Sequence, residues 1–211
     1  MSILVDLIRL NSKMNTFYLI RHGQKVGEAG DPGLTELGKE QAGKTTEFLK
    51  DKNISKIYSS TYKRTRETAE IINNTLKVEI KFDDRLRERM NWGSIPNQSL
   101  EEFLKEWEYS NTHRDFKPKA GISSLQSGQD AFNVISEIST FLPDSNIAII
   151  THGGVICDLL RNIFLDDELR KLEPDFPVKL DKLIKECSIT TLVKDSDKFT
   201  LKEIGTVDHL V

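Results

Sequence analysis

The segment 16–23, Thr-Phe-Tyr-Leu-Ile-Arg-His-Gly, constrains the fold of this chain more than any other. Residues 16–20 are β-branched, aromatic or aliphatic, which is the pattern of a buried strand. The apolar run stops at Arg21 and His22, and Gly23 then allows a sharp turn and a close approach to a ligand. Ligands of open α/β sheets bind beyond the carboxyl ends of the strands, so we expect the chemistry here.

A second strand has the same kind of ending. Residues 146–150 form the most apolar run of the chain, as a central parallel strand would, and Thr151, His152 and Gly153 follow it. An apolar helix is predicted directly after them, over 155–164. The first turn of a helix has free N–H groups and the positive end of its dipole, so this position favours an anion.

The other apolar patterns alternate between strand and helix, which predicts an α/β fold with a mostly parallel central sheet. No repeat, low-complexity tract or linker divides residues 14–211, and we expect one domain there. Further strands are expected at 56–60 and 78–82, and a closing hairpin at 189–194 and 199–204. Further helices are expected at 35–49, at 61–76, from 99 onward and at 127–142.

The composition is that of a soluble protein, and it excludes several classes of partner. A net charge of -3 over 211 residues gives no electrostatic footprint for nucleic acid or for an anionic membrane surface. No apolar run approaches the roughly 18 residues of a membrane span. Cys157 and Cys187 form neither a disulfide framework nor a CxxC site, so we expect reduced thiols and a cytoplasmic location.

Residues 1–13 precede the first strand and carry an apolar cluster interrupted by Asp6. The segment lacks the basic start and the small-residue cleavage site of a secretory signal. It is either an amphipathic arm that packs on the domain or on a second subunit of a homodimer, or an extension, with Met14 as the alternative start.

The strand ends suggest a specific chemistry if they meet at one edge of the sheet. Arg21, Arg64 and His152 would then surround one anion, and three cationic groups match a phosphate dianion. Their charge would keep His22 unprotonated, which is the form of imidazole that attacks as a nucleophile. The residues therefore predict phosphoryl transfer through a phosphohistidine.

Five motifs in order resemble those of the histidine phosphatase superfamily, in its phosphoglycerate-mutase-like branch. The resemblance extends from about Met14 to the end of the sequence. The motifs are Arg21-His22-Gly23, Leu34-Thr35-Glu36-Leu37-Gly38, Ser59-Ser60 with Arg64 and Thr68-Ala69, Leu86-Arg87-Glu88, and Thr151-His152-Gly153.

The resemblance implies a three-layer α/β/α sandwich with His22 as the nucleophile. It implies a phosphate pocket formed by Arg21, Arg64 and His152, which Gln24 and the backbone of Gly153 also line. It makes Glu88 the proton donor, because the acid phosphatase branch carries an Asp directly after its second histidine, where this chain has Gly153. We expect residues 89–128, approximately, to contribute a cap over the pocket, with Trp92, Phe103, Trp107 and Tyr109 as possible lining of an apolar entrance.

The leading functional prediction is a metal-independent phosphatase that hydrolyses small phosphorylated metabolites and needs no cofactor. A phosphoglycerate mutase is the nearest alternative, and a non-catalytic module that binds a phosphorylated ligand is another. Such a module could keep Arg21 and Arg64 but would not need His22, Glu88 and His152. A metal hydrolase is disfavoured, because the chain has only 4 His and no HxH or HExxH spacing.

Overall fold

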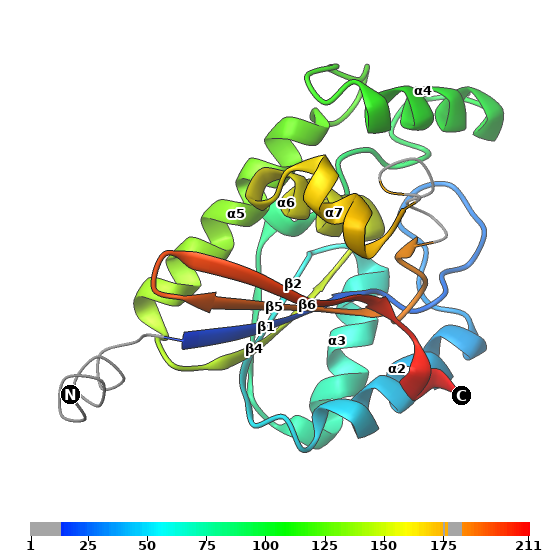
Figure 1. The fold of residues 1–211 in the computed structure, drawn as a ribbon. Coiled ribbons are helices and arrows are strands. Elements are labelled where there is room, and N and C mark those ends of the chain that lie inside the picture. The colour runs from blue at the N-terminus through cyan, green and yellow to red at the C-terminus, as the bar shows by residue number, and fades with distance from the viewer. Residues whose placement is uncertain (1–13, 175, 177–182) are drawn as a thin grey trace, which may run out of the picture.

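A computed structural model describes residues 14–174, 176 and 183–211 (Figure 1). The predicted N-terminal arm, residues 1–13, lies outside the described residues. The strands are β1 (Met14–Arg21), β2 (Ile54–Ser59), β3 (Glu79–Phe82), β4 (Asn146–Thr151), β5 (Ile189–Asp195) and β6 (Lys198–Thr206). The α-helices are α2 (Glu36–Leu49), α3 (Lys63–Leu76), α4 (Leu100–Thr112), α5 (Ser124–Phe141), α6 (Gly153–Ile163) and α7 (Asp166–Leu172), with 3-10 helices η1 (Asp84–Leu86) and η2 (Asp208–Leu210).

The six strands form one sheet in the order β3-β2-β4-β1-β5-β6. Strands β3, β2, β4 and β1 are parallel to one another, whereas β5 pairs antiparallel with β1 and β6 pairs antiparallel with β5. The mostly parallel sheet and its closing hairpin are thus confirmed. Strand β1 begins at Met14, two residues before the predicted start, because its pairing with β5 extends that far.

Helices cover both faces of the sheet, which makes three layers (Figure 1). The alternating side chains of β1 show why: Phe17 and Leu19 belong to the core under α5 and α6, whereas Ile20 belongs to the core under α2 and α3. The neighbouring strand β4 divides its residues in the same way, with Ile149 on the first face and Ile150 on the second. A strand segment buried on both faces is expected to be apolar, as residues 17–20 of β1 and 147–150 of β4 are.

The order of strands places a switch point between β1 and β4. The chain leaves β1 toward α2 on one face and leaves β4 toward α6 on the other (Figure 1). A crevice opens where such connections diverge, at the carboxyl ends of the strands. The register pairs Arg21 with Thr151, so His22 and His152 emerge next to each other at this edge.

Helix α4 lies away from the sheet, over its carboxyl edge (Figure 1). It begins with a capping box, in which the Ser99 hydroxyl accepts from the Glu102 N–H and the Glu102 carboxylate accepts from the Ser99 N–H. Helix α5 begins at Ser124 rather than at the predicted residue 127, because the Ser123 hydroxyl caps it by accepting from the Gln126 N–H.

Candidate active site

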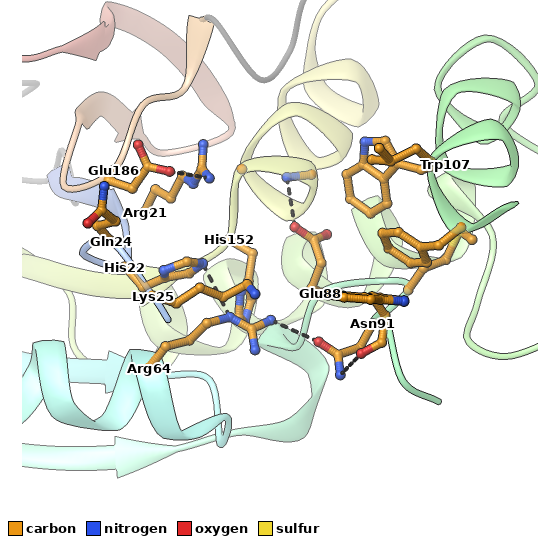
Figure 2. Close-up of a pocket in the computed structure, with 16 residues that line it drawn as sticks. Arg21, His22, Gln24, Lys25, Arg64, Glu88, Asn91, Trp107, His152 and Glu186 are labelled. Atoms are coloured by element: carbon orange, nitrogen blue, oxygen red, sulfur yellow. Dashed lines mark hydrogen bonds and ion pairs between the residues drawn. The ribbon is translucent and has the colours of Figure 1, made fainter. Parts of the chain in front are cut away.

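A cavity of about 390 Å³ lies between the carboxyl edge of the sheet and α4 (Figure 2). The seven residues predicted from the sequence all line it: Arg21, His22, Gln24, Arg64, Glu88, His152 and Gly153. The structure also brings to it nine residues that the sequence did not single out for the phosphate site: Lys25, Met90, Asn91, Trp92, Phe103, Leu104, Trp107, Gly154 and Glu186.

The His22 ring is held in one tautomer. Its Nδ1 lies 2.8 Å from the carbonyl oxygen of Gly23, which can only accept, so the proton of a neutral ring resides on Nδ1. Nε2 then carries the lone pair, and it faces the cavity. Nε of Arg64 donates a hydrogen bond to this lone pair, and the 3.3 Å between the two nitrogens is long for such a bond. Burial first, and then the charges of Arg64 and Arg21, hold the His22 pKa well below its usual value. The ring is therefore neutral at pH 7, as predicted, although burial contributes more than charge.

Close backbone contacts fix the loop that carries His22. A Cβ at Gly23 would lie 2.4 Å from the carbonyl oxygen of Gly38, and a Cβ at Gly38 would lie 2.1 Å from that of Gln24. The N–H of Gly23 donates to the Thr68 hydroxyl over 3.1 Å, which ties the loop to α3. These contacts explain why the motifs around residues 38 and 68 accompany the histidine motif in the sequence.

His152 lies beside His22 but presents its other ring nitrogen. The two ring centroids are 5.2 Å apart, and His152 is completely buried. Its Nε2 lies 2.9 Å from the Ser60 hydroxyl, whereas its Nδ1 has no hydrogen-bond partner among the described residues. A Ser60 hydroxyl that donates to Nε2 leaves the proton of the neutral ring on Nδ1.

The predicted positive charge of His152 is not supported. Burial first, and then the nearby Arg64, lower its pKa well below the usual value, so the ring is neutral at pH 7. With the Ser60 hydroxyl as donor to Nε2, the ring offers the cavity an N–H group at Nδ1 rather than a charge. Of the three groups predicted to surround the anion, Arg21 and Arg64 therefore carry the positive charge.

Each arginine is oriented by an acidic partner. Arg64 lies in the first turn of α3, and 3% of its surface is exposed. Its Nη1 lies 3.5 Å from a carboxylate oxygen of Asp31. That Nη1 makes no hydrogen bond in the described part of the chain. Arg21 donates to the Glu186 carboxylate over 2.7 Å and to the Ile184 carbonyl over 2.6 Å.

Glu88 approaches the same cavity from the opposite side (Figure 2). It follows η1 and accepts from the N–H of Gly154, 3.1 Å away at the start of α6. Burial raises its pKa, against the opposing charge of Arg89, so this carboxyl retains a proton to higher pH than an exposed glutamate. A Cβ at residue 154 would lie 2.4 Å from Oε1 of Glu88, which explains the second glycine after His152.

A buried ion pair joins the segment that follows η1 to α6. Arg89 and Asp158 of α6 are 1% exposed and pair over 2.8 Å. The Arg89 guanidinium also lies 4.0 Å from the centroid of the Trp107 ring and donates to Asn111, both of α4. These contacts hold α4 next to Glu88. The buried charge of Arg89 is compensated by the Asp158 carboxylate and by its contacts with the two side chains of α4.

The cap gives the cavity an apolar end. Met90, Trp92, Phe103, Leu104 and Trp107 line it, so three of the four suggested aromatic residues contribute. The fourth, Tyr109, stacks on His113 with 3.8 Å between the ring centroids and borders a different groove.

Within the described residues, no group of three or more His, Cys, Asp or Glu side chains is placed to hold a metal ion. No helix of the described ranges is long and apolar enough to cross a membrane.

Three polar residues that line the cavity were not predicted from the sequence and belong to none of its motifs: Lys25, Asn91 and Glu186. Only the position of Lys25 next to Gln24 could have indicated it.

Comparisons with known proteins identify the family of the chain. The family described as "Histidine phosphatase superfamily (branch 1)" matches residues 17–206. An uncharacterized phosphatase, PhoE, of Bacillus subtilis is 26% identical over 93% of this chain and 97% of its own length. A probable phosphoglycerate mutase, GpmB, of Escherichia coli is 32% identical over 69% of this chain and 73% of its own. A mycobacterial glucosyl-3-phosphoglycerate phosphatase, solved with inorganic phosphate, superposes with a TM-score of 0.70 and 21% identity, over 92% of this chain and 98% of that one. The chain belongs to the histidine phosphatase superfamily.

Proposed function

We propose that this protein is a metal-independent phosphatase that hydrolyses small phosphomonoesters through a phosphohistidine on His22. One observation carries the proposal: Nε2 of a neutral His22 faces a cavity in which Arg64 Nη1 and His152 Nδ1 lack hydrogen-bond partners among the described residues. Buried polar groups normally make hydrogen bonds, so two buried nitrogens that make none, one of them on a guanidinium group, favour an anionic ligand beside the nucleophile.

In the first step the phosphoryl group binds between Arg21, Arg64 and His152, next to the first turn of α6. Nε2 of His22 attacks phosphorus, the bond to the ester oxygen breaks, and its electron pair leaves with that oxygen. Glu88 gives its proton to the departing alkoxide and becomes a carboxylate. Its raised pKa supports this role, because the acid must still hold a proton near neutral pH.

In the second step water replaces the alcohol. The Glu88 carboxylate takes a proton from the water, whose oxygen attacks phosphorus while the bond to Nε2 breaks. Phosphate leaves, and His22 and Glu88 return to their starting forms. No step in this cycle requires a metal, since the arginines supply the charge that stabilises the transferring group.

A phosphoglycerate mutase is the second candidate, because a relative that is 32% identical has the name of a probable one. The two activities share the phosphohistidine and differ in its acceptor. Water accepts the phosphoryl group in a phosphatase, and a second sugar acid accepts it in a mutase. Release of phosphate from 3-phosphoglycerate, without formation of 2-phosphoglycerate, would favour the phosphatase.

The test is to quench the enzyme during turnover of a radiolabelled phosphomonoester in excess chelator. We expect an acid-labile, base-stable phosphate on the wild type and none on His22→Ala, whose turnover should be abolished while its circular dichroism is unchanged. Vanadate should inhibit the wild type. Loss of activity in chelator that a divalent ion restores, or full turnover by His22→Ala, would overturn the proposal.

A further inference from the structure

Among the described residues that line the cavity, one cation, Lys25, has no part in the proposed chemistry. Lys25 lies three residues after His22 and lines the cavity. Its backbone forms an isolated antiparallel β-bridge with Leu34. Figure 2 shows its side chain extended beside those of His22 and Arg64. This position brings a third positive charge close to the two arginines.

Lys25 differs from both arginines in its partners. Arg21 and Arg64 each have a carboxylate oxygen within 4.0 Å, from Glu186 and Asp31. No carboxylate of the described residues lies that close to Nζ of Lys25, which donates only to the carbonyl oxygens of Val26 and Glu28, over 3.3 and 3.4 Å. Those bonds are long, and an ammonium group has three protons to donate.

The surroundings of Lys25 favour an anion. Burial lowers the pKa of its ammonium group, and the charges of Arg64 and Arg21 lower it further, so the unliganded cavity disfavours this charge. An anion placed next to Nζ would relieve that repulsion. The transferred phosphoryl group already has Arg21, Arg64, the Nδ1 of His152 and the first turn of α6 available to it.

The cavity has room for more than a phosphoryl group. A volume of about 390 Å³ is in the range of sites that enclose a whole small molecule. The alcohol part of a substrate must point away from His22, because the leaving oxygen departs opposite the nucleophile. It would then lie among Glu88, Lys25 and the apolar residues of the cap.

We propose that Lys25 binds a second anionic group, a carboxylate or a second phosphoryl group, on the alcohol part of the substrate. This inference rests on the proposed phosphatase function. It assigns specificity to a residue in the loop of the nucleophile, and it makes phosphomonoesters with a second anionic group the preferred substrates.

The test compares Lys25→Met with the wild type on two matched pairs of substrates. Glycerol 3-phosphate and 3-phosphoglycerate differ by one carboxylate, and fructose 6-phosphate and fructose 1,6-bisphosphate differ by one phosphoryl group. We expect Lys25→Met to lower kcat/KM by about 10- to 100-fold, in at least one pair, on the member that carries the second anionic group, as loss of a charged hydrogen bond does. On the two members without that group we expect a loss of less than about twofold. The pair that responds identifies the source of the second charge.

Two control variants make the result specific. Lys25→Arg keeps the charge and should retain much of the preference for substrates with a second anionic group. Lys39→Met removes an equal charge from the exposed face of α2, and it should leave kcat/KM unchanged for both pairs of substrates. Equal losses on all four substrates would show that Lys25 contacts the transferred phosphoryl group, and no loss on any would show that it contacts no substrate. Either result overturns this inference and leaves the proposed function standing. Absence of a phosphoenzyme in the wild type would instead overturn the proposed function.

Discussion

The cavity has two walls of different origin. The sheet wall consists of Arg21, His22, Arg64 and His152, which come from strand ends and the first turn of α3. The cap wall consists of Glu88 with Met90, Trp92, Phe103, Leu104 and Trp107, which come from the segment after η1 and from α4. The sheet wall is polar and largely buried, whereas the cap wall joins one carboxyl group to an apolar surface.

The difference separates two tasks. A phosphoryl group is the same in every phosphomonoester, and the rigid edge of the sheet holds the groups proposed to meet it. The alcohol varies from substrate to substrate, and the cap holds the acid and the apolar side chains proposed to meet that part. Changes in the sheet wall should therefore affect all substrates alike, and changes in the cap wall should depend on the leaving group.

Arg64→Ala should give the largest effect among the variants that keep His22. We expect kcat/KM to fall by two to three powers of ten, roughly equally on alkyl and aryl phosphates, because one preorganised charge is lost. The His22 pKa should rise, since Arg64 lowers it in the wild type, so the acidic limb of the pH profile should move to higher pH.

Arg66→Ala is the matched control for Arg64→Ala. Arg66 lies on the same helix but packs over Phe82, away from the cavity. It should retain nearly full activity and an unchanged pH profile. A loss from Arg64→Ala that differs strongly between alkyl and aryl phosphates would break the division of tasks between the walls.

Glu88→Gln should give the next largest effect, and a selective one. An alkyl phosphate expels a basic alkoxide that needs a proton, whereas nitrophenyl phosphate expels a stable phenolate. We expect a loss of about 100-fold or more in phosphoenzyme formation from alkyl phosphates, and a much smaller loss in the burst with nitrophenyl phosphate. The burst is the quantity to measure, because slow hydrolysis of the phosphoenzyme would hide the difference at steady state.

Glu70→Gln, on the exposed side of α3, controls for the loss of one charge and should change neither burst. Equal losses in both bursts for Glu88→Gln would mean that this carboxyl group only positions the substrate. The donor would then have to be sought elsewhere in the cavity, outside the cap wall.

The sheet wall was predictable because its determinants are local in the sequence. A buried parallel strand must be apolar, so the sudden change at Arg21 and His22 marks its end, and Gly23 marks the turn. The same pattern recurs at His152, and parallel strands bring such ends to one edge. The tautomers were not predictable, because they depend on the Gly23 carbonyl and on Ser60, 92 residues away from His152.

The cap wall depends on pairings between distant residues, and the sequence pattern does not contain them. Glu88 is one of 33 acidic residues, and what distinguishes it is burial next to the N–H of Gly154. Arg89 appears in the sequence as one charge in a charged stretch, yet it is 1% exposed because Asp158, 69 residues later, pairs with it. Family resemblance identified Glu88 as the candidate proton donor. Only the three-dimensional structure identified Arg89 as the buried partner of Asp158.

Trp107→Leu should give a smaller effect, confined to the alcohol side. Trp107 packs on the Arg89 guanidinium and lines the apolar end of the cavity. We expect KM to rise by about three- to tenfold for substrates with a large alcohol part, as loss of one cation–π and apolar contact allows, with the inhibition constant of free phosphate unchanged. Tyr109→Leu, which alters the same helix outside the cavity, should leave both constants unchanged. A weaker inhibition by phosphate in Trp107→Leu would show that the cap wall also shapes the phosphate site.

Removal of residues 1–13 should have the smallest effect and gives the baseline for both walls. Strand β1 carries the predicted nucleophile at its carboxyl end, and its eight residues place Met14 about 23 Å from Arg21. In a chain that begins at Met14, the terminal amine can still donate to Asp144, as the Met14 N–H does over 2.8 Å. We therefore expect kcat to stay within about twofold on every substrate, because no residue of either wall has been touched. A collapse of kcat without a change in circular dichroism would mean that the segment contributes to the cavity, and the site would then need a third wall.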